Sequence, residues 1–421
     1  MTKPHLTHRP KKTFRRYQRI LKKLFLILGI CLASKHANAE PKVGAIRVLF
    51  LGHESEHHNS NKFYPMLAKS LGRDAIYFDY VTSVEEALGD ADYLNKFDAL
   101  LLYANHGRIS PGQWKNLKGY VEGGGGFVPV HCASWCFGNE PGFDQLVGGR
   151  FASHKTGTFT AKVVDPKHPA MAGVKEFEAW DETYKHRNNN KKDRQVLMVR
   201  EVAEKGDNIT EPEPWTWVRT QGKGRVFYTA SGHDERVWKQ PAFHQLLKAG
   251  ILWSVGEARK QSYEKFIAGR APLKYEKRDN IPNYEKRSEP LPYQFPLSAK
   301  DSMDYTQAPV GFRLELFASE PDVINPIGLA WDERGRLWVA ETVDYPNEMT
   351  PNRFGNDKIK ILEDTDGDGK CDKVTVFAEG LNIPTSLTFS RGGVIVAHVP
   401  DFLLLKDTDG DDKADVREVL N

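Results

Sequence analysis

Four histidines follow short apolar segments in the first part of the chain, at positions where strands of a sheet are expected to end. They are His53 after IRVLFLG, His106 after ALLLYAN, His131 after GGGGFVPV and His233 after RVFYTASG. If these segments are parallel strands of one sheet, their carboxyl ends share one edge, and the histidines gather there as a histidine rim. Such a group can bind a metal, transfer protons near neutral pH or hold the hydroxyl groups of a sugar.

Acidic and aromatic side chains accompany the histidine rim. The polar residues that accompany it are Glu54, His57, His58, His154, Asp234 and Glu235. The aromatic residues near these acids are Trp135, Trp180, Tyr184 and Trp238. Such rings stack on sugars, and they equally suit the packing of a core. The residue types alone leave metal binding, proton transfer and sugar binding open.

A thiol nucleophile is the competing interpretation. Cys132 follows an apolar segment, and His233 and Glu235 have the spacing that orients a base toward a cysteine, as in class I glutamine amidotransferases. In those enzymes glycines flank the nucleophile two residues away on each side. Around Cys132 these positions hold Val130 and Ser134. The sequence therefore disfavours an active amidotransferase.

Alternating apolar and amphipathic segments are expected to position the histidine rim. The alternation runs from Ile46 to about Gly256 and predicts an α/β domain with a parallel sheet covered by helices on both faces. Strands are expected over 46–51, 75–81, 99–103, 127–130, 157–164, 196–200, 215–219 and 225–230. Helices are expected over 61–71, 111–121 and 241–255, with Asn59 or Ser60 and Ser110 as caps.

The first 39 residues have the pattern of a secretory signal. A Lys- and Arg-rich stretch precedes the apolar run Leu24–Ala33, and Ala37-Asn38-Ala39 offers a cleavage site. We therefore expect an exported protein, periplasmic or extracellular, with an uncleaved membrane anchor as the alternative. The segment holds 10 of the 59 basic residues and no acidic ones, which leaves 49 basic against 56 acidic, a net charge of −7. This balance argues against a nucleic-acid partner.

The second half of the chain contains a linker and a repeat. Residues 258–309 are charged and proline-rich, as in a linker. PIGLAWDERGRLWVAE at 326–341 is echoed by PTSLTFSRGGVIVAH at 384–398, and ILEDTDGDGKCDK at 361–373 by LLKDTDGDDKADV at 404–416. The offsets differ by about fifteen residues, which predicts an insertion near 344–357. Short strands with this period are typical of β-propeller blades, and about two blades predict a truncated propeller over 310–421.

The repeated aspartate loops are candidate cation sites. Their carboxylates have the alternate spacing that converges on a hard cation, and Ca²⁺ is the cation expected in an exported protein, with solvated turns as the alternative. The ligands expected are Asp364, Asp366, Asp368, Asp372, Asp407, Asp409, Asp411 and Asp415. Gly369 stands where the first loop needs a sharp turn, whereas Asp412 takes that place in the second.

Several strings of the first domain resemble a known family. They are LLYANHGRISPGQWKNLKGYVEGGGGFVPVHCAS, GGRFASHKTGTF, EAWDETY, EPWTWV and GKGRVFYTASGHDERVW, and they resemble the ThuA-like (trehalose utilisation) domain. The resemblance implies a flavodoxin-like fold related to class I glutamine amidotransferases but without their working cysteine site. It also implies carbohydrate catabolism through keto-sugar intermediates.

The end of the chain resembles a second family. From about Val310 it is similar to the start of the propeller of planctomycete-type membrane-bound dehydrogenase-like proteins. This resemblance implies quinoprotein-like sugar oxidation and an electron-accepting cytochrome as partner. It places any quinone or haem site beyond Asn421.

Together these observations predict four segments: a signal peptide at 1–39, a ThuA-like domain at 40–257, a linker at 258–309 and a partial propeller at 310–421. We expect an exported carbohydrate-catabolism protein whose first domain binds or converts a sugar or keto-sugar. The catalytic residues expected are His131, His233 and Glu182, and the substrate-binding residues are His53, Glu54, His154, Trp180 and Asp234. Whether the histidine rim binds a transition metal stays open. The alternatives are a non-catalytic carbohydrate-binding or scaffold module and, less favoured, a thiol enzyme.

Overall fold

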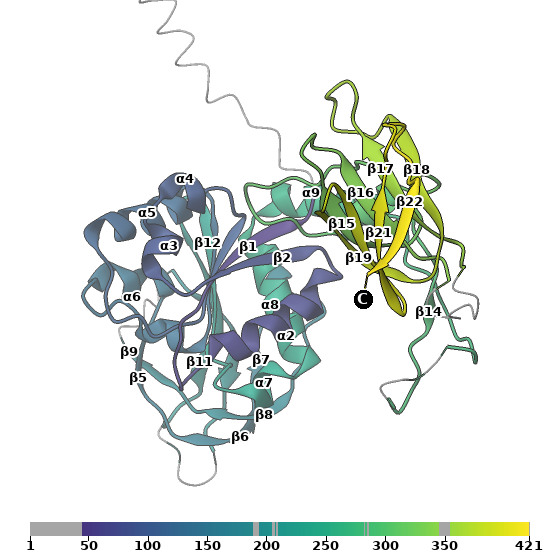
Figure 1. Ribbon diagram of the computed structural model, residues 1–421. Helices are drawn as coiled ribbons and strands as arrows, with labels where there is room; N and C mark the ends of the chain where they lie inside the picture. Colours follow the sequence, from purple (N-terminus) through teal and green to yellow (C-terminus); the bar gives the residue numbers. More distant parts are fainter. Residues whose placement is uncertain are drawn as a thin grey trace, which may run out of the picture. The chain divides into compact units, whose positions relative to one another are not determined.

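The computed structural model describes residues 44–187, 193–203, 207, 209–281, 283, 286–344 and 354–420 (Figure 1). The chain divides into two compact units, one ending at Ala268 and one beginning at Gly269, and we describe each by itself. The expected signal peptide and most of the expected insertion near 344–357 lie outside the described residues. Among the described residues, every helix is too short or too polar to cross a lipid bilayer.

The first unit is built on an eight-stranded sheet with the strand order β2-β1-β3-β4-β12-β11-β10-β7. The strands in this order are β2 (Ile76–Val81), β1 (Ile46–Leu51), β3 (Ala99–Leu102), β4 (Gly126–Pro129), β12 (Gly224–Thr229), β11 (Glu213–Gln221), β10 (Gln195–Arg200) and β7 (Lys162–Val163). The first five are parallel to one another, and the last three pair in antiparallel fashion. The sheet is therefore mixed, whereas the sequence predicted a parallel one.

The antiparallel half has a local cause. Gln221 pairs with Gly224, so only two residues connect β11 to β12. Gly222 has a φ of +60°, a value that glycine adopts without strain. A connection this short can only join antiparallel strands, because a parallel pair needs a long crossover.

Helices cover both faces of this sheet, as predicted. The longer ones are α2 (Ser60–Gly72), α5 (Pro111–Gly123), α6 (Pro141–Val147), α8 (Pro241–Ser254) and α9 (Glu257–Gly269), and the short ones are α3 (Val84–Leu88), α4 (Ala91–Leu94) and α7 (Glu235–Trp238). Figure 1 shows α3 and α5 on one side of the sheet and α2 and α8 on the other. Ser110 and Gln113 form a reciprocal capping box at the start of α5, and Asn59 caps α2.

Close packing holds α8 against the sheet. A side chain at Gly250 would place its Cβ 2.5 Å from the ring of Phe227 on β12, so only glycine lets the helix lie this close. Trp215, Trp217 and Tyr228 are fully buried nearby in β11 and β12. This packing fixes the end of β12, and His233 follows that end by four residues.

Two small hairpin-like sheets extend the first unit beside the large one. β5 (Arg150–Ser153) pairs with β9 (Lys185–Arg187), and β6 (Thr156–Thr160) pairs with β8 (Glu178–Glu182). The single strand expected over 157–164 is therefore divided between β6 and β7. The acidic string FEAWDETY at 177–184, which the sequence pattern did not assign to a helix or strand, contains β8 and with it Glu182.

The segment that the sequence assigned to a linker starts with helix α9, which packs on the first unit. Arg259 Nε donates to Asp98 Oδ1 at 3.0 Å, and the Tyr263 hydroxyl donates to the Asp74 carbonyl at 2.6 Å. The first unit thus extends beyond the expected boundary at 257. The later part of the segment contains β13 (Tyr275–Glu276), β14 (Tyr293–Gln294) and α10 (Ala299–Met303).

The second unit contains two four-stranded antiparallel sheets, each made of consecutive strands. They are β15 (Pro326–Trp331), β16 (Leu337–Glu341), β17 (Asp357–Glu363) and β18 (Lys373–Leu381), and then β19 (Pro384–Ser390), β20 (Gly393–His398), β21 (Asp401–Lys406) and β22 (Val416–Leu420). Trp338 and Val394, one from each sheet, belong to a shared apolar core. The two sheets match the two sequence echoes, and the truncated propeller stays a prediction.

Candidate functional site

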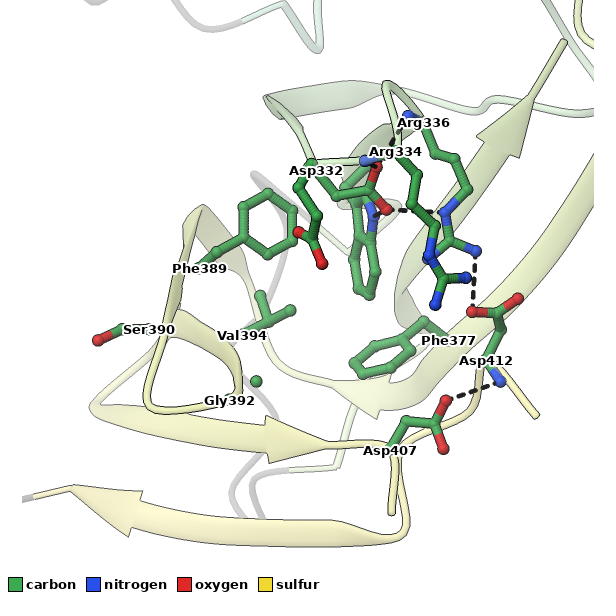
Figure 2. Close-up of a pocket in the computed structure, with 13 residues that line it drawn as sticks. Asp332, Arg334, Arg336, Phe377, Phe389, Ser390, Gly392, Val394, Asp407 and Asp412 are labelled. Carbon is green, nitrogen blue, oxygen red and sulfur yellow. Dashed lines mark hydrogen bonds and ion pairs between the residues drawn. The ribbon is translucent and has the colours of Figure 1, made fainter. Parts of the chain in front are cut away.

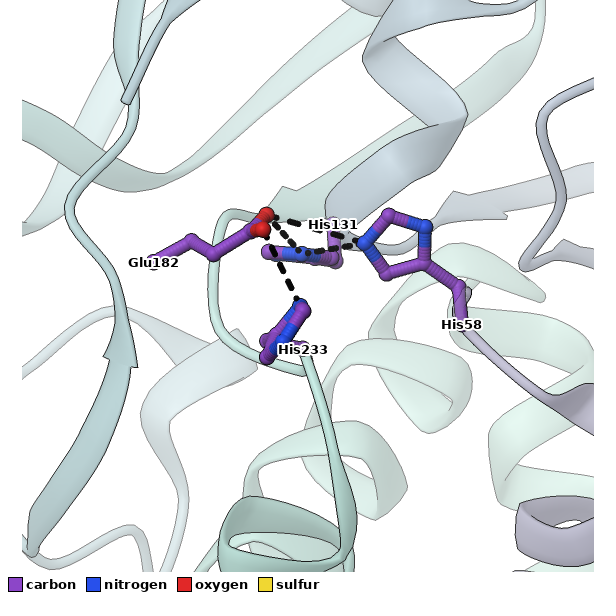
Figure 3. Close-up of side chains that lie close together, drawn as sticks. All are labelled: His58, His131, Glu182 and His233. Carbon is purple, nitrogen blue, oxygen red and sulfur yellow. Dashed lines mark hydrogen bonds and ion pairs between the residues drawn. The ribbon is translucent and has the colours of Figure 1, made fainter. Parts of the chain in front are cut away.

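Side chains from several segments meet at the edge of the large sheet where its parallel strands end (Figure 3). His131 begins η2 (His131–Trp135) directly after β4, and His233 follows β12. His58 comes from the loop between β1 and α2, and Glu182 is the last residue of β8. We call these four residues the His–Glu cluster.

The atoms of the His–Glu cluster lie very close together. His58 Nε2 and His131 Nε2 are 3.2 Å apart, and Glu182 Oε2 lies 3.2 Å from His131 Nε2 and 3.6 Å from His58 Nε2. The other carboxylate oxygen, Glu182 Oε1, is 3.2 Å from His233 Nδ1 and 3.5 Å from His154 Nδ1. Four histidines thus share one carboxylate group.

His58 and His131 have strained backbones, with φ values of +56° and +50°. Such conformations cost about 1–3 kcal/mol each in residues other than glycine, and they persist where the surroundings hold them. Ser134 Oγ donates to the His131 carbonyl at 3.1 Å, and His53 Nε2 lies 3.2 Å from the His58 carbonyl. The local structure therefore holds both imidazoles in position at a cost in stability.

The hydrogen bonds of His131 define its tautomer. Its Nδ1 lies 2.6 Å from the Ala230 carbonyl, which can only accept, so Nδ1 carries a proton. His131 is fully buried, and burial lowers its pKa to about 4 in spite of the opposing effect of Glu182. A neutral His131 therefore directs the lone pair of Nε2 at Glu182 and His58.

The pKa values of Glu182 and His233 are shifted in opposite directions. Burial acts to raise the pKa of Glu182, but its close contacts with the imidazoles of His131, His233 and His58 outweigh this effect and hold that pKa far below the usual range. Burial acts to lower the pKa of His233, and its hydrogen bond and attraction to Glu182 raise it above the ordinary value. The site therefore holds an ionised carboxylate at neutral pH.

Asp181 fixes the loop that carries His233. Its two carboxylate oxygens accept the backbone N–H groups of Gly232 at 3.0 Å and His233 at 3.1 Å. The Tyr103 hydroxyl donates to the Gly232 carbonyl at 2.8 Å. Burial raises the pKa of Asp181 to about 7. One strand, β8, thus supplies both Glu182 and the group that positions His233.

A second buried polar network lies beneath His131. The Tyr228 hydroxyl is 3.0 Å from the His131 carbonyl and 3.0 Å from Ser134 Oγ. His186 Nε2 lies 3.1 Å from the same hydroxyl, and His186 Nδ1 lies 2.9 Å from Glu213 Oε1. This network supports the turn at which His131 is strained.

Some residues predicted for the site lie elsewhere. His53 uses Nδ1 to accept the Asn105 N–H at 3.4 Å, and its other nitrogen faces the His58 carbonyl, so it supports the site without reaching Glu182. His106 Nε2 lies 2.9 Å from the Gly52 carbonyl. Glu54 is exposed. Of the predicted histidine rim, only His131 and His233 contact the carboxylate.

Trp180 and Asp234 border the cluster. The Trp180 ring centroid is 5.7 Å from that of His233, and the Arg236 guanidinium lies 3.4 Å from the Trp180 ring. Asp234 caps the start of α7 and forms an ion pair with Arg236, which lowers the pKa of Asp234. The carboxylate of Asp234 is therefore already paired with the guanidinium of Arg236.

From the sequence, His58 and Tyr184 were expected near the histidine rim but not among the catalytic or substrate-binding residues, and Asp181 was not expected there. Tyr184 stacks on His131 with ring centroids 4.2 Å apart. His58 stands among the histidines after the first strand, but nothing in HESEHH distinguishes it from His57. Asp181 directly precedes Glu182, and both are buried although neighbouring residues of a strand face opposite sides, so no alternation in the sequence marks them.

The thiol interpretation finds no support in the geometry. Cys132 is 1% exposed, and burial raises the pKa of its thiol well above the ordinary value, so the thiolate is absent at neutral pH. His131 takes the strained position after β4, at a strand-to-helix turn like the one that presents the nucleophile in elbow-type enzymes. A histidine stands where such enzymes place their nucleophile.

The aspartate loops each bring three carboxylates together. These are Asp364, Asp366 and Asp372 in the first loop and Asp407, Asp409 and Asp415 in the second. Asp368 and Asp411 turn instead toward the amines of Lys370 and Lys413, at 3.2 Å and 3.4 Å. Backbone N–H groups of the loops donate to the carboxylates, for example Gly367 N to Asp364 at 2.7 Å. The calcium assignment stays a prediction.

A hollow in the second unit lies between side chains of both sheets (Figure 2). Its charged groups neutralise one another, because Arg336 contacts Asp332 at 2.7 Å and Asp412 at 2.8 Å. Trp338 Nε1 also donates to Asp332 at 3.0 Å. These contacts account for Asp332, Arg336 and Asp412 as parts of the fold.

Comparisons with known proteins agree with the resemblance of the first unit. The family described as trehalose utilisation (ThuA) matches residues 47–254, and a domain of unknown function (DUF7133) matches residues 298–421. No curated protein matches the chain.

Solved structures with a similar fold include two proteins described as ThuA-like. The one from Parabacteroides merdae has 19% identity and a TM-score of 0.45, covering 50% of this chain and 90% of its own. The one from Bacteroides uniformis has 19% identity and a TM-score of 0.44, covering 52% of this chain and 94% of its own. The assignment rests on the family match: residues 47–254 form a ThuA-like domain, of the family described as trehalose utilisation.

Proposed function

We propose that the ThuA-like domain binds a sugar or keto-sugar at the His–Glu cluster and converts it there. The observation that carries this proposal is the convergence of His58, His131, His154 and His233 on the single carboxylate of Glu182. A structural ion pair needs one partner, whereas an ionised group with four histidines around it is typical of a reacting centre. The family description supports a carbohydrate as the substrate.

The residues around the cluster supply what a sugar needs. His154 is partly exposed, with 38% of its side chain accessible, so it can reach a bound ligand while its Nδ1 stays near Glu182. Trp180 lies beside His233 and offers an aromatic ring, although Arg236 covers one of its faces. Ring stacking and hydrogen bonds from charged groups are the interactions that hold sugars.

The same cluster can act in two ways. Without a metal, His131 and His233 would serve as base and acid, since their surroundings shift their pKa values in opposite directions. With a metal, the same nitrogen atoms would be ligands and could not transfer protons. His154 would then be the histidine left for proton transfer.

The wider setting is also a proposal. The leader at 1–39 supports export to the periplasm or beyond. The two repeated four-stranded sheets support blades of a propeller, and quinoprotein-like sugar oxidation with a cytochrome as electron acceptor follows from that resemblance. In this scheme the ThuA-like domain acts on a sugar before or after its oxidation.

The test measures binding and conversion separately on the full chain. Trehalose and its keto derivatives are titrated calorimetrically against the parent, the Glu182→Gln and His154→Ala variants and the control His57→Ala, whose exposed residue precedes His58. We expect conversion by the parent and the control, and none by Glu182→Gln. Binding by the parent with no sugar converted would leave the second candidate, a carbohydrate-binding module, and binding of none of them would reject both.

A further inference from the structure

We propose that His58, His131, His233 and Glu182 together bind one transition-metal ion of the zinc type. The ligand atoms of these four residues all lie within 4.8 Å of one another. The inference deepens the proposed function, on which its chemistry toward sugars rests. Metal binding itself is measured without any sugar.

The geometry of three atoms fits an ion better than a set of hydrogen bonds. His58 Nε2, His131 Nε2 and Glu182 Oε2 form a triangle with sides of 3.2, 3.2 and 3.6 Å. A point equidistant from the three lies about 1.9 Å from each, and bonds from zinc to imidazole nitrogen or carboxylate oxygen measure about 2.0–2.2 Å. An ion slightly out of the plane of the triangle would therefore reach all three atoms.

The three atoms of the triangle carry too few protons to form a hydrogen bond along each of its sides. His131 Nδ1 uses its proton on the Ala230 carbonyl, so a neutral His131 offers a lone pair to the triangle. Glu182 Oε2 is an acceptor as a carboxylate, and a neutral His58 can donate from Nε2 along only one side. The side between His131 and Glu182 then joins two acceptors, which repel unless a cation lies between them.

A second proton on His131 is the arrangement that would hold the triangle without a metal. It requires a cationic imidazole at a position with no solvent exposure, which is costly even beside a carboxylate. The two arrangements differ in composition, because only one contains a metal. The experiment therefore distinguishes them directly.

The surroundings of His131 resemble the support of a metal ligand. Histidine ligands usually donate their second nitrogen to a carbonyl or carboxylate, and His131 Nδ1 does so at 2.6 Å. His58 has no such partner, since its Nδ1 is buried without a hydrogen bond. Its backbone is held instead through its carbonyl, which faces His53. Both residues have strained φ values, as ligand-holding residues often do.

The ligand types indicate the class of metal. Imidazole nitrogen suits Zn²⁺ and its first-row neighbours, whereas Ca²⁺ and Mg²⁺ prefer oxygen ligands. The Nδ1 of the fourth residue, His233, lies 3.2 Å from the other carboxylate oxygen, Glu182 Oε1, and within 4.8 Å of the ligand atoms of the other residues. A metal held here would polarise a carbonyl or hydroxyl oxygen of a sugar as a Lewis acid.

The experiment uses the full chain, stripped of metal with a chelator and kept in excess calcium so that the aspartate loops do not take up the probe. Co²⁺ is titrated into the parent and its visible d–d bands are recorded, and Zn²⁺ content is measured after dialysis. We expect about one Co²⁺ per chain with nitrogen ligation in the parent and in His57→Ala. We expect retention to fall to near zero in His58→Ala and Glu182→Gln.

Equal retention by the parent and by folded His58→Ala would overturn the proposal, as would a parent that holds no metal after loading. Where the variants do not fold, X-ray absorption of the zinc-loaded parent decides: imidazole ligation supports the site, and ligation by oxygen alone rejects it. Failure of the proposed function would give a different result from failure of the metal proposal. A protein that holds the metal but converts no sugar contradicts the enzymatic proposal only, and conversion by the metal-free protein contradicts only the metal.

Discussion

Replacing Tyr228 with phenylalanine removes one oxygen atom from the network beneath His131. The hydroxyl lies 3.0 Å from the His131 carbonyl, 3.0 Å from Ser134 Oγ and 3.1 Å from His186 Nε2, and the side chain is fully buried. The ring itself is kept, so no large cavity forms. The variant therefore isolates the polar contribution of this atom.

The expected loss follows from the number of bonds that the hydroxyl can make. With one proton and two lone pairs it takes part in two or three hydrogen bonds, each with a net contribution of about 1 kcal/mol. His186 Nε2 then loses its contact with the hydroxyl, which adds to the cost. We expect the Tyr228→Phe variant to lose about 2–4 kcal/mol in its free energy of unfolding.

Tyr120→Phe is the matched control. Tyr120 is also buried, at 6% exposure, but its hydroxyl lies 3.5 Å from the Phe97 carbonyl, the limit of a hydrogen bond. Urea unfolding of both variants and the parent, followed by tryptophan fluorescence of the first unit, measures the difference. If Tyr228→Phe loses no more stability than Tyr120→Phe, the network does not hold the His131 turn, and the reasoning is wrong.

Two further outcomes are expected. Burial raises the pKa of the Cys132 and Cys136 thiols, the latter to about 12, so alkylation of the native protein at pH 8 followed by peptide mapping labels Cys371 ahead of both. Labelling of Cys132 in the native state would contradict its assigned burial. If the aspartate loops bind Ca²⁺, calcium at about 100 times Kd stabilises the second unit by about 2.7 kcal/mol for each loop that binds an ion, and the Asp366→Asn/Asp409→Asn double variant shows a smaller rise in Tm.

Much of the first unit is predictable from local pattern. β1 coincides with the expected strand at 46–51, and α5 begins at Pro111 behind the expected Ser110 cap. Both follow from short-range physics, since a buried strand needs an apolar run and a helix needs its first N–H groups satisfied. The antiparallel half of the sheet is harder to predict from local pattern, because strand direction depends on the length of each connection.

The site is only partly predictable for a related reason. His131 and His233 stand at strand ends, where the topology of a parallel sheet gathers side chains, so their meeting could be foreseen. His58 follows β1 by seven residues in an irregular loop, and its approach to His131 depends on a positive φ that no pattern marks. Glu182 belongs to β8, whose register against β6 brings Glu182 opposite Thr156.

The difference between His131 and Cys132 decides how this fold can do chemistry. His131 follows the last residue of β4 by two positions and Cys132 by three, yet His131 takes the strained position and faces the carboxylate, while Cys132 is buried with a thiol of raised pKa. A nucleophilic thiol would need the strained position that faces the carboxylate, together with a nearby base. Because that position holds an imidazole whose second nitrogen is tied to Ala230, the centre is suited to holding a cation or a proton against Glu182. With the proposed metal ion bound, the centre would polarise a bound oxygen without forming a covalent thiol intermediate.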